Sequence, residues 1–535
     1  MSSSVQAVEL VFLLLLLFVV AFGALARKLK VPYPIVLVIA GALLGFVPGI
    51  PPIALNPDIV FFVVLPPLIY SAAWLTSWRE FSFNMVSILL LAFGLVAFTV
   101  FGIASAAKWL FTGFDWQLGF VLGAVVAPTD AIAATSIAQR IGLPKRIVDI
   151  LEGESLVNDA SGLLALEFGI AMVVRNQTLT IGGGLLRLLY LTLVGLLVGL
   201  VTGWIVNHLE RRIDHGPIEI AISILVPYVA YLGAEAIHSS GVLAVVACGL
   251  YLSRRSSDFF SPGVRLQVWS VWEALTFILN GLVFVMIGLQ LPYVLAGIHG
   301  YSLRTLVLYG ALFSALLIAL RMIWIFPGTY LAYLIRTRVF HQSVQLPSAT
   351  GILVVGWTGM RGVIALAAAI SLPQMLDNGS AFPERNLIIF LAFSAIFVTL
   401  VLQGLTLPFL VRLLHLSDAS TPNIEEETAR REILQAGLAY LEEARKNDDK
   451  EFTEIYNDLS GHYQQRLTAL SNMDHLEDGA KLHERFSQLS HQLLRVERQT
   501  AVRLRNQGRI NDEILREFER DLDLREAGYH AKGNT

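Results

Sequence analysis

Long apolar runs follow one another almost without pause over the first 415 residues of this chain. A helix needs about 20 apolar residues to cross the hydrocarbon core of a bilayer. By that measure the sequence predicts thirteen spans, of which the ninth is short and the eleventh is long. The predicted spans are residues 8–26, 33–50, 57–76, 84–110, 116–139, 147–174, 181–206, 217–237, 240–253, 268–288, 302–334, 348–371 and 386–414. We therefore expect an all-α polytopic membrane protein.

Charged residues are concentrated at the C-terminal end of the chain. Only 15% of the 535 residues are charged, whereas a typical soluble domain has about 25%. Residues 416–535 hold 24 acidic and 17 basic side chains, which is about half of all the charges. This division predicts a transmembrane domain at residues 1–415 and a helical cytosolic tail at 416–535 with a regulatory or assembly role. The net charge of −3 is too small to suggest a nucleic-acid partner.

The Lys and Arg residues of the loops predict the orientation of the spans. The loops after odd-numbered spans carry fourteen of these residues, and the opposite face carries five. Basic residues are enriched on the cytoplasmic side of membrane proteins. With thirteen spans, the N-terminus is then expected outside and the C-terminus in the cytoplasm. The compact outer loops favour a bacterial inner, or plasma, membrane.

Two of the predicted spans contain residues that interrupt a helix. The fifth span carries Pro128, and proline removes a backbone donor and clashes with the preceding turn. The twelfth span carries three glycines and Arg361 within residues 356–362. Transporters build ion sites from half-helix ends at membrane depth, and a break in each half of the chain indicates inverted repeats with the site between them.

The sixth span is crowded with polar side chains. An acidic residue at the centre of a bilayer helix costs on the order of 2.5–3.5 kcal/mol on insertion scales, so several in one span indicate an ion pathway or a partner. Ser155 and Asp159 are four residues apart and share a helix face, while Glu154 and Asn158 form the adjacent stripe. The expected partner is Arg361, which we predict to form a structural ion pair with Glu154.

These residues predict a site for a monovalent cation. Na⁺ prefers hard oxygen ligands, which Asp130, Asp159, Ser155 and the Thr129 backbone can supply. A carboxylate in a poorly hydrated cavity favours its protonated form, so H⁺ and Na⁺ compete for the same group. Alternating access to Asp159 then exchanges Na⁺, or Li⁺, for H⁺. Two structural roles stay open: Asp130 could cap the broken helix, and Ser155 could bond to its own backbone one turn back.

These stretches resemble the cation–proton antiporters, the family of the bacterial sodium–proton antiporters and the animal sodium–proton exchangers. The specific signal is Glu-Ser-x-x-Asn-Asp at residues 154–159, which follows Pro-Thr-Asp at 128–130. Weaker matches are residues 65–68, 359–362 and 403–406. The resemblance implies an inverted-repeat fold with crossed interrupted helices in spans five and twelve. It also implies a core domain that moves against a dimerising domain, and a homodimer surrounded by membrane lipid.

The resemblance also implies a role for each site residue. Asp159 would be the essential carrier carboxylate and Asn158 its partner, with Asp130, Ser155 and the Thr129 backbone completing the cation shell. An Asn directly before the key Asp implies electroneutral one-for-one exchange, in the service of pH and sodium homeostasis. Relatives often have an acidic residue where this chain has Ser71, so affinity and selectivity are expected to differ.

The sequence leaves other transport functions open. K⁺/H⁺ exchange would use the same machinery, because selectivity depends on cavity size and ligand count. A channel or a non-transporting membrane sensor is a second class, although no filter repeat or pore ring is visible. Cys248 is the single cysteine, so no disulfide framework or cysteine-based metal site is expected. We expect no enzyme activity and no cofactor, only Na⁺ and H⁺ as transported substrates.

Overall fold

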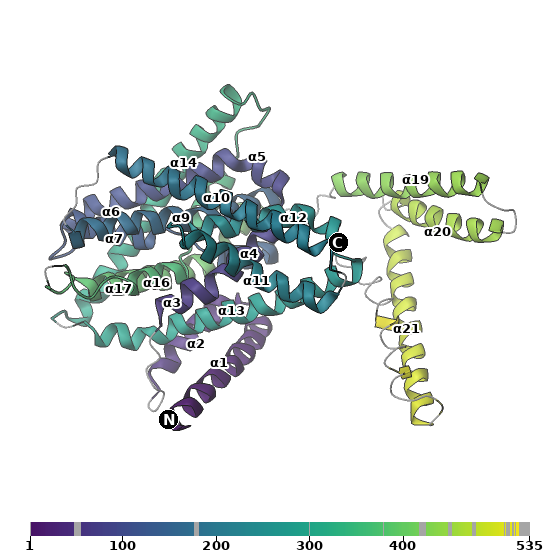
Figure 1. Cartoon of the computed structure of the whole chain (residues 1–535), viewed down its shortest axis with the longest axis horizontal. Helices are drawn as coiled ribbons and strands as arrows, with labels where there is room; N and C mark the ends of the chain where they lie inside the picture. The colour runs from purple at the N-terminus through teal and green to yellow at the C-terminus, as the bar shows by residue number, and fades with distance from the viewer. Residues whose placement is uncertain are drawn as a thin grey trace. The chain divides into compact units, whose positions relative to one another are not determined.

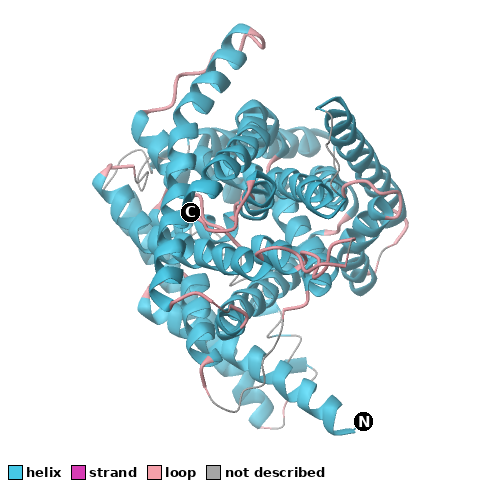
Figure 2. Cartoon of the chain, turned by 90° about the vertical axis from the view of Figure 1, so that its left-hand side faces the viewer, coloured by secondary structure: helices cyan, strands magenta, loops and turns pink. Residues whose placement is uncertain are grey.

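The structure is a computed structural model, and the helices of residues 1–419 pack against one another (Figures 1 and 2). The chain divides into two compact units, Met1–Ala419 and Ser420–Thr535. The residues that the structure describes are 2–47, 55–175, 181–213, 215–298, 300–377, 379–416, 424–447, 452–472, 478–507, 509, 514–515, 518 and 521–523.

The first unit contains a helical counterpart for each of the thirteen predicted spans. Among the described residues, eight helical stretches are long and apolar enough to cross a membrane, and α2 and α7 are shorter apolar helices. The helices are α1 (Ser2–Leu29), α2 (Tyr33–Gly45), α3 (Pro57–Ile59), α4 (Leu65–Leu75), α5 (Trp78–Leu89), α6 (Val96–Leu110), α7 (Trp116–Val126), α8 (Ala131–Ile141), α9 (Lys145–Arg175), α10 (Ile181–Glu210), α11 (Gly216–Glu235), α12 (Gly241–Phe259), α13 (Pro262–Ala296), α14 (Leu303–Arg338), α15 (Ala349–Trp357), α16 (Val363–Ile370), α17 (Arg385–Val398) and α18 (Gly404–Leu413). The chain is therefore a multi-pass, all-α membrane protein, as the sequence predicts.

Both predicted helix interruptions are confirmed. Helix α7 ends at Val126, residues 127–130 are not helical, and α8 begins at Ala131. The gap occurs at Pro128, because proline has no backbone N–H and cannot make the hydrogen bond that a continuous helix needs there. In the twelfth span α15 ends at Trp357, and α16 begins only at Val363. The two breaks leave backbone polar groups at helix ends, which must find partners inside the protein.

Three spans also contain a π-helical turn: η1 (Val60–Val64) continues into α4, η2 (Leu90–Leu95) joins α5 to α6, and η3 (Thr399–Gln403) joins α17 to α18. Such turns are frequent at functional sites because they disturb the regular hydrogen-bond ladder. The carbonyl of Ala92 in η2 accepts a hydrogen bond from the Ser161 hydroxyl of α9. The hydroxyl of Thr399 in η3 accepts one from the Arg361 backbone amide, at 3.1 Å. Two π-helical turns thus supply partners to segments next to the polar residues.

Small residues allow some helices to approach closely. A Cβ atom at Gly41 of α2 would overlap the Val285 carbonyl of α13, and one at Gly199 of α10 would overlap the Ala244 carbonyl of α12. Interfaces of this kind are common between membrane helices, where packing rather than the hydrophobic effect drives association.

The second unit is helical over its described residues. Its main helices are α19 (Ile424–Asn447), α20 (Thr453–Asn472) and α21 (Asp478–Asn506). Gly437 of α19 lies against the Tyr463 ring of α20. The tail is therefore helical over these residues, as the sequence predicts.

Candidate ion-binding site

The two interrupted helices meet at Asp130. Its backbone amide donates to the Met360 carbonyl at 2.8 Å, which links one break directly to the other. Its Oδ1 accepts from the Ile132 amide at 2.8 Å and caps the N-terminus of α8. A Cβ atom at Gly362 would overlap the Asp130 carboxylate, so this side chain also lies at the start of α16. One carboxylate therefore faces two helix N-termini, where negative charge is favourable.

Two arginines bind the opposite ends of the broken helices. Arg361 Nε donates to the Val126 carbonyl at the end of α7 at 2.7 Å, and its Nη1 donates to the Gly359 carbonyl at 2.6 Å. Arg321 Nε donates to the Gly356 carbonyl near the end of α15 at 3.1 Å. Helix C-termini carry partial negative charge. Each guanidinium thus neutralises one half-helix end that the breaks leave inside the membrane.

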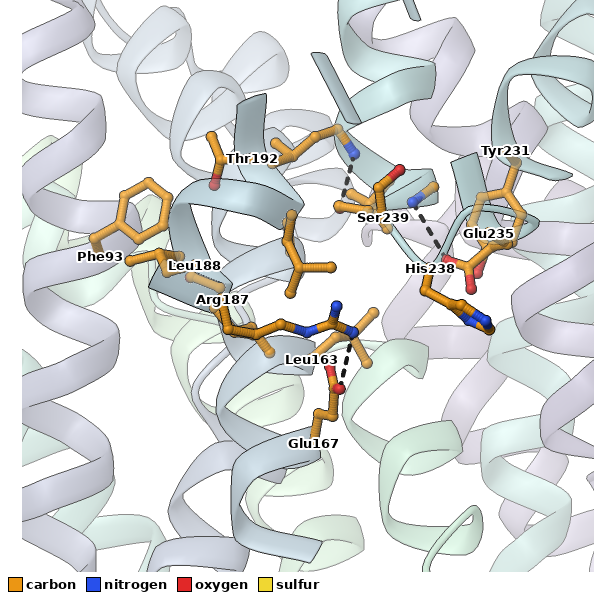
Figure 3. Close-up of a pocket in the computed structure, with 18 residues that line it drawn as sticks. Phe93, Leu163, Glu167, Arg187, Leu188, Thr192, Tyr231, Glu235, His238 and Ser239 are labelled. Atoms are coloured by element: carbon orange, nitrogen blue, oxygen red, sulfur yellow. Dashed lines mark hydrogen bonds and ion pairs between the residues drawn. The ribbon is translucent and has the colours of Figure 1, made fainter. Parts of the chain in front are cut away.

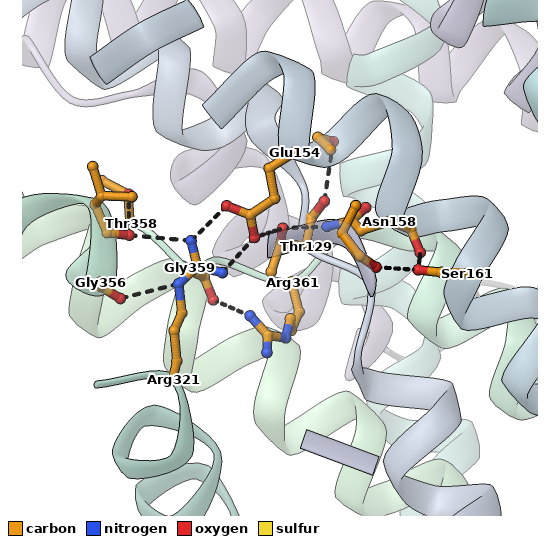
Figure 4. Close-up of polar contacts among 12 residues, drawn as sticks. Thr129, Glu154, Asn158, Ser161, Arg321, Gly356, Thr358, Gly359 and Arg361 are labelled. Atoms are coloured by element: carbon orange, nitrogen blue, oxygen red, sulfur yellow. Dashed lines mark hydrogen bonds and ion pairs between the residues drawn. The ribbon is translucent and has the colours of Figure 1, made fainter. Parts of the chain in front are cut away.

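Glu154 forms its ion pair with Arg321 of α14 (Figure 4). Arg321 Nη1 donates to Glu154 Oε1 at 2.5 Å, and Nη2 donates to Oε2 at 2.9 Å. Both residues are only 1% exposed. The predicted pair between Glu154 and Arg361 is therefore wrong. Arg361 is held by backbone carbonyls, and the two-pronged geometry of Arg321 satisfies both carboxylate oxygens.

Arg321 is the functional residue that the sequence analysis missed. It lies near the middle of the 36-residue helix α14 and is fully enclosed by protein. A cation at that depth is costly without a partner. Its central place within an apolar run was the signal that could have identified it as the partner of Glu154.

The Thr129 hydroxyl connects this ion pair to the sixth span (Figure 4). It donates to Glu154 Oε1 at 3.0 Å and accepts from Asn158 Nδ2 at 2.6 Å. The Thr129 carbonyl accepts from the Ser155 hydroxyl at 3.0 Å. These bonds fix the orientation of the Asn158 amide. Its Oδ1 is buried and has no hydrogen-bond partner among the described residues.

Asp159 follows Asn158 on α9 and is 5% exposed. It lies one helical turn after Ser155 on the same face of α9. No hydrogen bond to its carboxylate occurs within the part of the chain that the structure describes. Hydrogen bonds join Thr129 to Ser155 and Asn158, and Asp130 and Asp159 directly follow Thr129 and Asn158 in the chain. Asp130 and Ser155 also make structural hydrogen bonds. Asp159 is left as the carboxylate most available to an ion.

The donor set suits a hard monovalent cation. Carboxylate, hydroxyl and amide oxygens are the ligands that such ions prefer. Over the described residues, no group of three or more His, Cys, Asp or Glu side chains could hold a metal ion. Ser71 of α4 is half-buried, and its hydroxyl donates to the Leu68 carbonyl at 3.4 Å, so this position offers no carboxylate.

Gly362→Ala is expected to damage the crossing of the two broken helices. Its Cβ atom would overlap the Asp130 side chain, and overpacking of a close contact typically costs about 1–3 kcal/mol. We expect this loss of stability together with strongly reduced cation-driven proton movement in proteoliposomes. Gly263→Ala is the matched control, because nothing lies within 4 Å of a Cβ atom there. Equal behaviour of the two variants would contradict the close contact.

The chain is similar to known transport proteins over most of its length. The family of transmembrane sodium/hydrogen exchangers matches residues 13–413. An uncharacterised Na⁺/H⁺ exchanger of Mycobacterium tuberculosis is 32% identical over 516 residues, covering 95% of this chain and 94% of that protein. A sodium, potassium, lithium and rubidium/H⁺ antiporter of Bacillus subtilis is 30% identical over 529 residues, covering 96% and 77%.

A solved structure shares the fold of the membrane unit. The sodium–proton antiporter MjNhaP1 of Methanocaldococcus jannaschii superposes with a TM-score of 0.57 at 19% identity, covering 77% of this chain and 99% of that one. The predicted antiporter fold and the resemblance to cation–proton antiporters are confirmed. This chain is a transporter rather than an enzyme, and it belongs to the sodium/hydrogen exchanger family.

Proposed function

We propose that this chain is a secondary active antiporter that exchanges Na⁺, or Li⁺, for H⁺ in a 1:1 electroneutral cycle. The observation that supports the proposal best is the buried Asp159 carboxylate, whose neighbour Asn158 is hydrogen-bonded to Thr129 in the break between α7 and α8. A buried carboxylate without a fixed partner is costly in its charged form. It therefore binds either a proton or a metal cation, and the two compete.

Each residue has a defined part in this exchange. Asp159 carries H⁺ in one half of the cycle and Na⁺ in the other. The Ser155 hydroxyl, the Asn158 Oδ1 atom and the Asp130 carboxylate complete the oxygen shell, and the Thr129 backbone holds Ser155 in place. The exchange is electroneutral because Asn158 is an amide: one titrating carboxylate trades one proton for one monovalent cation.

The cellular setting follows from the same reasoning. The protein acts in a bacterial plasma membrane, with its N-terminus outside and its C-terminus in the cytoplasm, because basic loops favour the cytoplasmic face. It serves pH and sodium homeostasis, and it works as a homodimer in which a core domain moves against a dimerising domain. Residues 416–535 form a cytosolic regulatory or assembly module.

Purified protein in proteoliposomes tests this function directly. With a proton gradient and a pH-sensitive dye inside, Na⁺ and Li⁺ are expected to dissipate the gradient, and choline is not. Replacing chloride with the permeant anion thiocyanate removes any membrane potential and is expected to leave the Na⁺-driven rate unchanged. A rate that follows the membrane potential would contradict 1:1 exchange. A cation current without coupled proton movement would indicate a channel instead.

K⁺/H⁺ exchange is the second candidate function. The Bacillus subtilis relative is named for sodium, potassium, lithium and rubidium. The resemblance also implies that this chain has Ser71 in place of an acidic residue. A site with fewer carboxylates binds cations by fewer strong ligands, and this favours a less selective exchanger. In the same liposomes, K⁺-driven proton movement as fast as Na⁺-driven movement would establish this alternative.

A further inference from the structure

A polar cavity lies where the second half of α9 meets α10, α11 and α12 (Figure 3). Its volume is about 280 Å³. It is lined by Leu163 of α9, Thr192 of α10, Glu235 of α11 and Leu243 of α12. A cavity of this size holds several water molecules. It is therefore large enough for a hydrated monovalent cation.

Two residues that line this cavity are next to the proposed carrier site in the chain. Ala160 and Ser161, which follow Asp159 directly on α9, both line it. The Ser161 hydroxyl donates to the Asn158 carbonyl at 2.9 Å and also bonds to the Ala92 carbonyl of η2. The cavity is therefore lined by the turn of α9 that directly follows Asn158 and Asp159.

An ion pair crosses the cavity between α9 and α10. Arg187 Nη2 donates to Glu167 Oε1 at 3.1 Å, and the two side chains are 35% and 53% exposed (Figure 3). A second carboxylate, Glu235, accepts from the Gly241 amide at 3.3 Å. The cavity is thus lined by two carboxylates, one guanidinium and the imidazole of His238. Partly exposed pairs of this kind contribute little to stability.

The cavity lies toward the face with few basic loop residues. Glu167 is near the C-terminal end of α9, Arg187 is near the start of α10, and Glu235 ends α11. The opposite ends of these helices carry Lys145 and Arg211. By the distribution of positive charge, the cavity opens to the outside.

We propose that this cavity is the outer vestibule for the transported cation and that the Glu167–Arg187 pair is its electrostatic gate. The identity of the ion rests on the proposed exchange function, but the vestibule itself does not. In the paired state Arg187 neutralises Glu167 and opposes cation entry. When the pair opens, Glu167 and Glu235 raise the local cation concentration next to Ser161, as carboxylates in a confined space do.

Labelling of single cysteines tests the vestibule without measuring transport. Cys248 is the one cysteine of the chain and is buried, so the full-length Cys248→Ala protein is the background. In intact cells, Thr192→Cys on the cavity wall is expected to react with a charged, membrane-impermeant thiol reagent at least about tenfold faster than the neighbouring Leu193→Cys, because only a hydrated thiol ionises. Leu193 is 62% exposed on the outer surface of the unit.

Leu188→Cys and Leu189→Cys form a second matched pair, since Leu188 lines the cavity and Leu189 is exposed. Faster labelling of the cavity-facing member from outside supports the vestibule. Equal labelling of the pair, or labelling that requires access from the cytoplasmic side, overturns it. These outcomes hold whether or not the protein exchanges Na⁺ for H⁺.

Charge removal tests the gate. Glu167→Gln leaves Arg187 unpaired and is expected to raise the apparent KM for external Na⁺ about threefold, whereas Arg187→Gln frees Glu167 and is expected to lower it by a similar factor. The double variant should lie near the starting protein. All shifts should shrink at high ionic strength, and the KM for internal Na⁺ should not move. If both single variants raised the apparent KM for external Na⁺, the pair would have a purely structural role. That result would overturn the gate.

Discussion

Asp159→Asn is expected to reduce cation-driven proton movement to the rate of protein-free liposomes. The amide matches the carboxylate in shape but can neither release a proton nor neutralise a bound cation. The side chain is 5% exposed, and no hydrogen bond to it occurs among the described residues, so its replacement by an amide of the same shape breaks no hydrogen bond. Removal of a buried charge can even favour the folded state. The variant should therefore insert into the membrane, fold and bind detergent like the original protein. The dye assay should detect only the passive leak of protons across the lipid.

Asp115→Asn is the matched control for this experiment. Asp115 caps the N-terminus of α7 by accepting from the Leu118 amide at 2.8 Å. Asparagine caps helices as well as aspartate does. The control carries the same chemical change outside the ion site, and it should retain exchange. Retained exchange in Asp159→Asn, at equal protein per liposome and equal melting temperature, would remove the carrier role from this residue.

The sequence was sufficient to predict features that depend on local chemistry. Each span follows from an apolar run of sufficient length. The breaks follow from Pro128 and from the glycines around Arg361, because these residues act on their own helix. The crowding of polar residues near Asp159 was likewise visible, because helical spacing places Ser155 and Asp159 on one face.

Contacts between spans were harder to predict. The sequence shows that Glu154 needs a cation, but Arg321 and Arg361 are both buried arginines in apolar runs. The choice depends on where α14 lies against α9, and no spacing along the chain reports that. The bridging role of the Thr129 hydroxyl between Glu154 and Asn158 depends on the same packing.

The outer cavity was not predictable for the same reason. Glu167 and Arg187 occur near the ends of consecutive spans, where exposed charges are common and usually carry no function. Their significance comes from Ser161, which lies on the same cavity and bonds to the segment that carries Asn158. That coincidence requires four helices in their folded positions.

Arg321→Ala is expected to lower the free energy of unfolding by about 3–5 kcal/mol, because it leaves the Glu154 carboxylate buried without its partner. The variant also removes donors to the Val355 and Gly356 carbonyls at the end of α15. Arg361→Ala removes donors to carbonyls but leaves no carboxylate without its cation, so its cost should be smaller. SDS titration in mixed micelles and thermal melting of the purified protein measure both variants.

Two further variants decide which arginine serves Glu154. Arg187→Ala breaks a partly exposed pair and should cost no more than about 1 kcal/mol, which gives the baseline for losing an arginine. In a double-mutant cycle, Glu154→Gln should relieve much of the cost of Arg321→Ala, since residues in direct contact have coupled effects on stability. The same change should leave the cost of Arg361→Ala nearly unaltered. Stronger coupling of Glu154 to Arg361 than to Arg321 would restore the pairing predicted from sequence, and it would contradict the two hydrogen bonds that join Arg321 to both oxygens of this carboxylate.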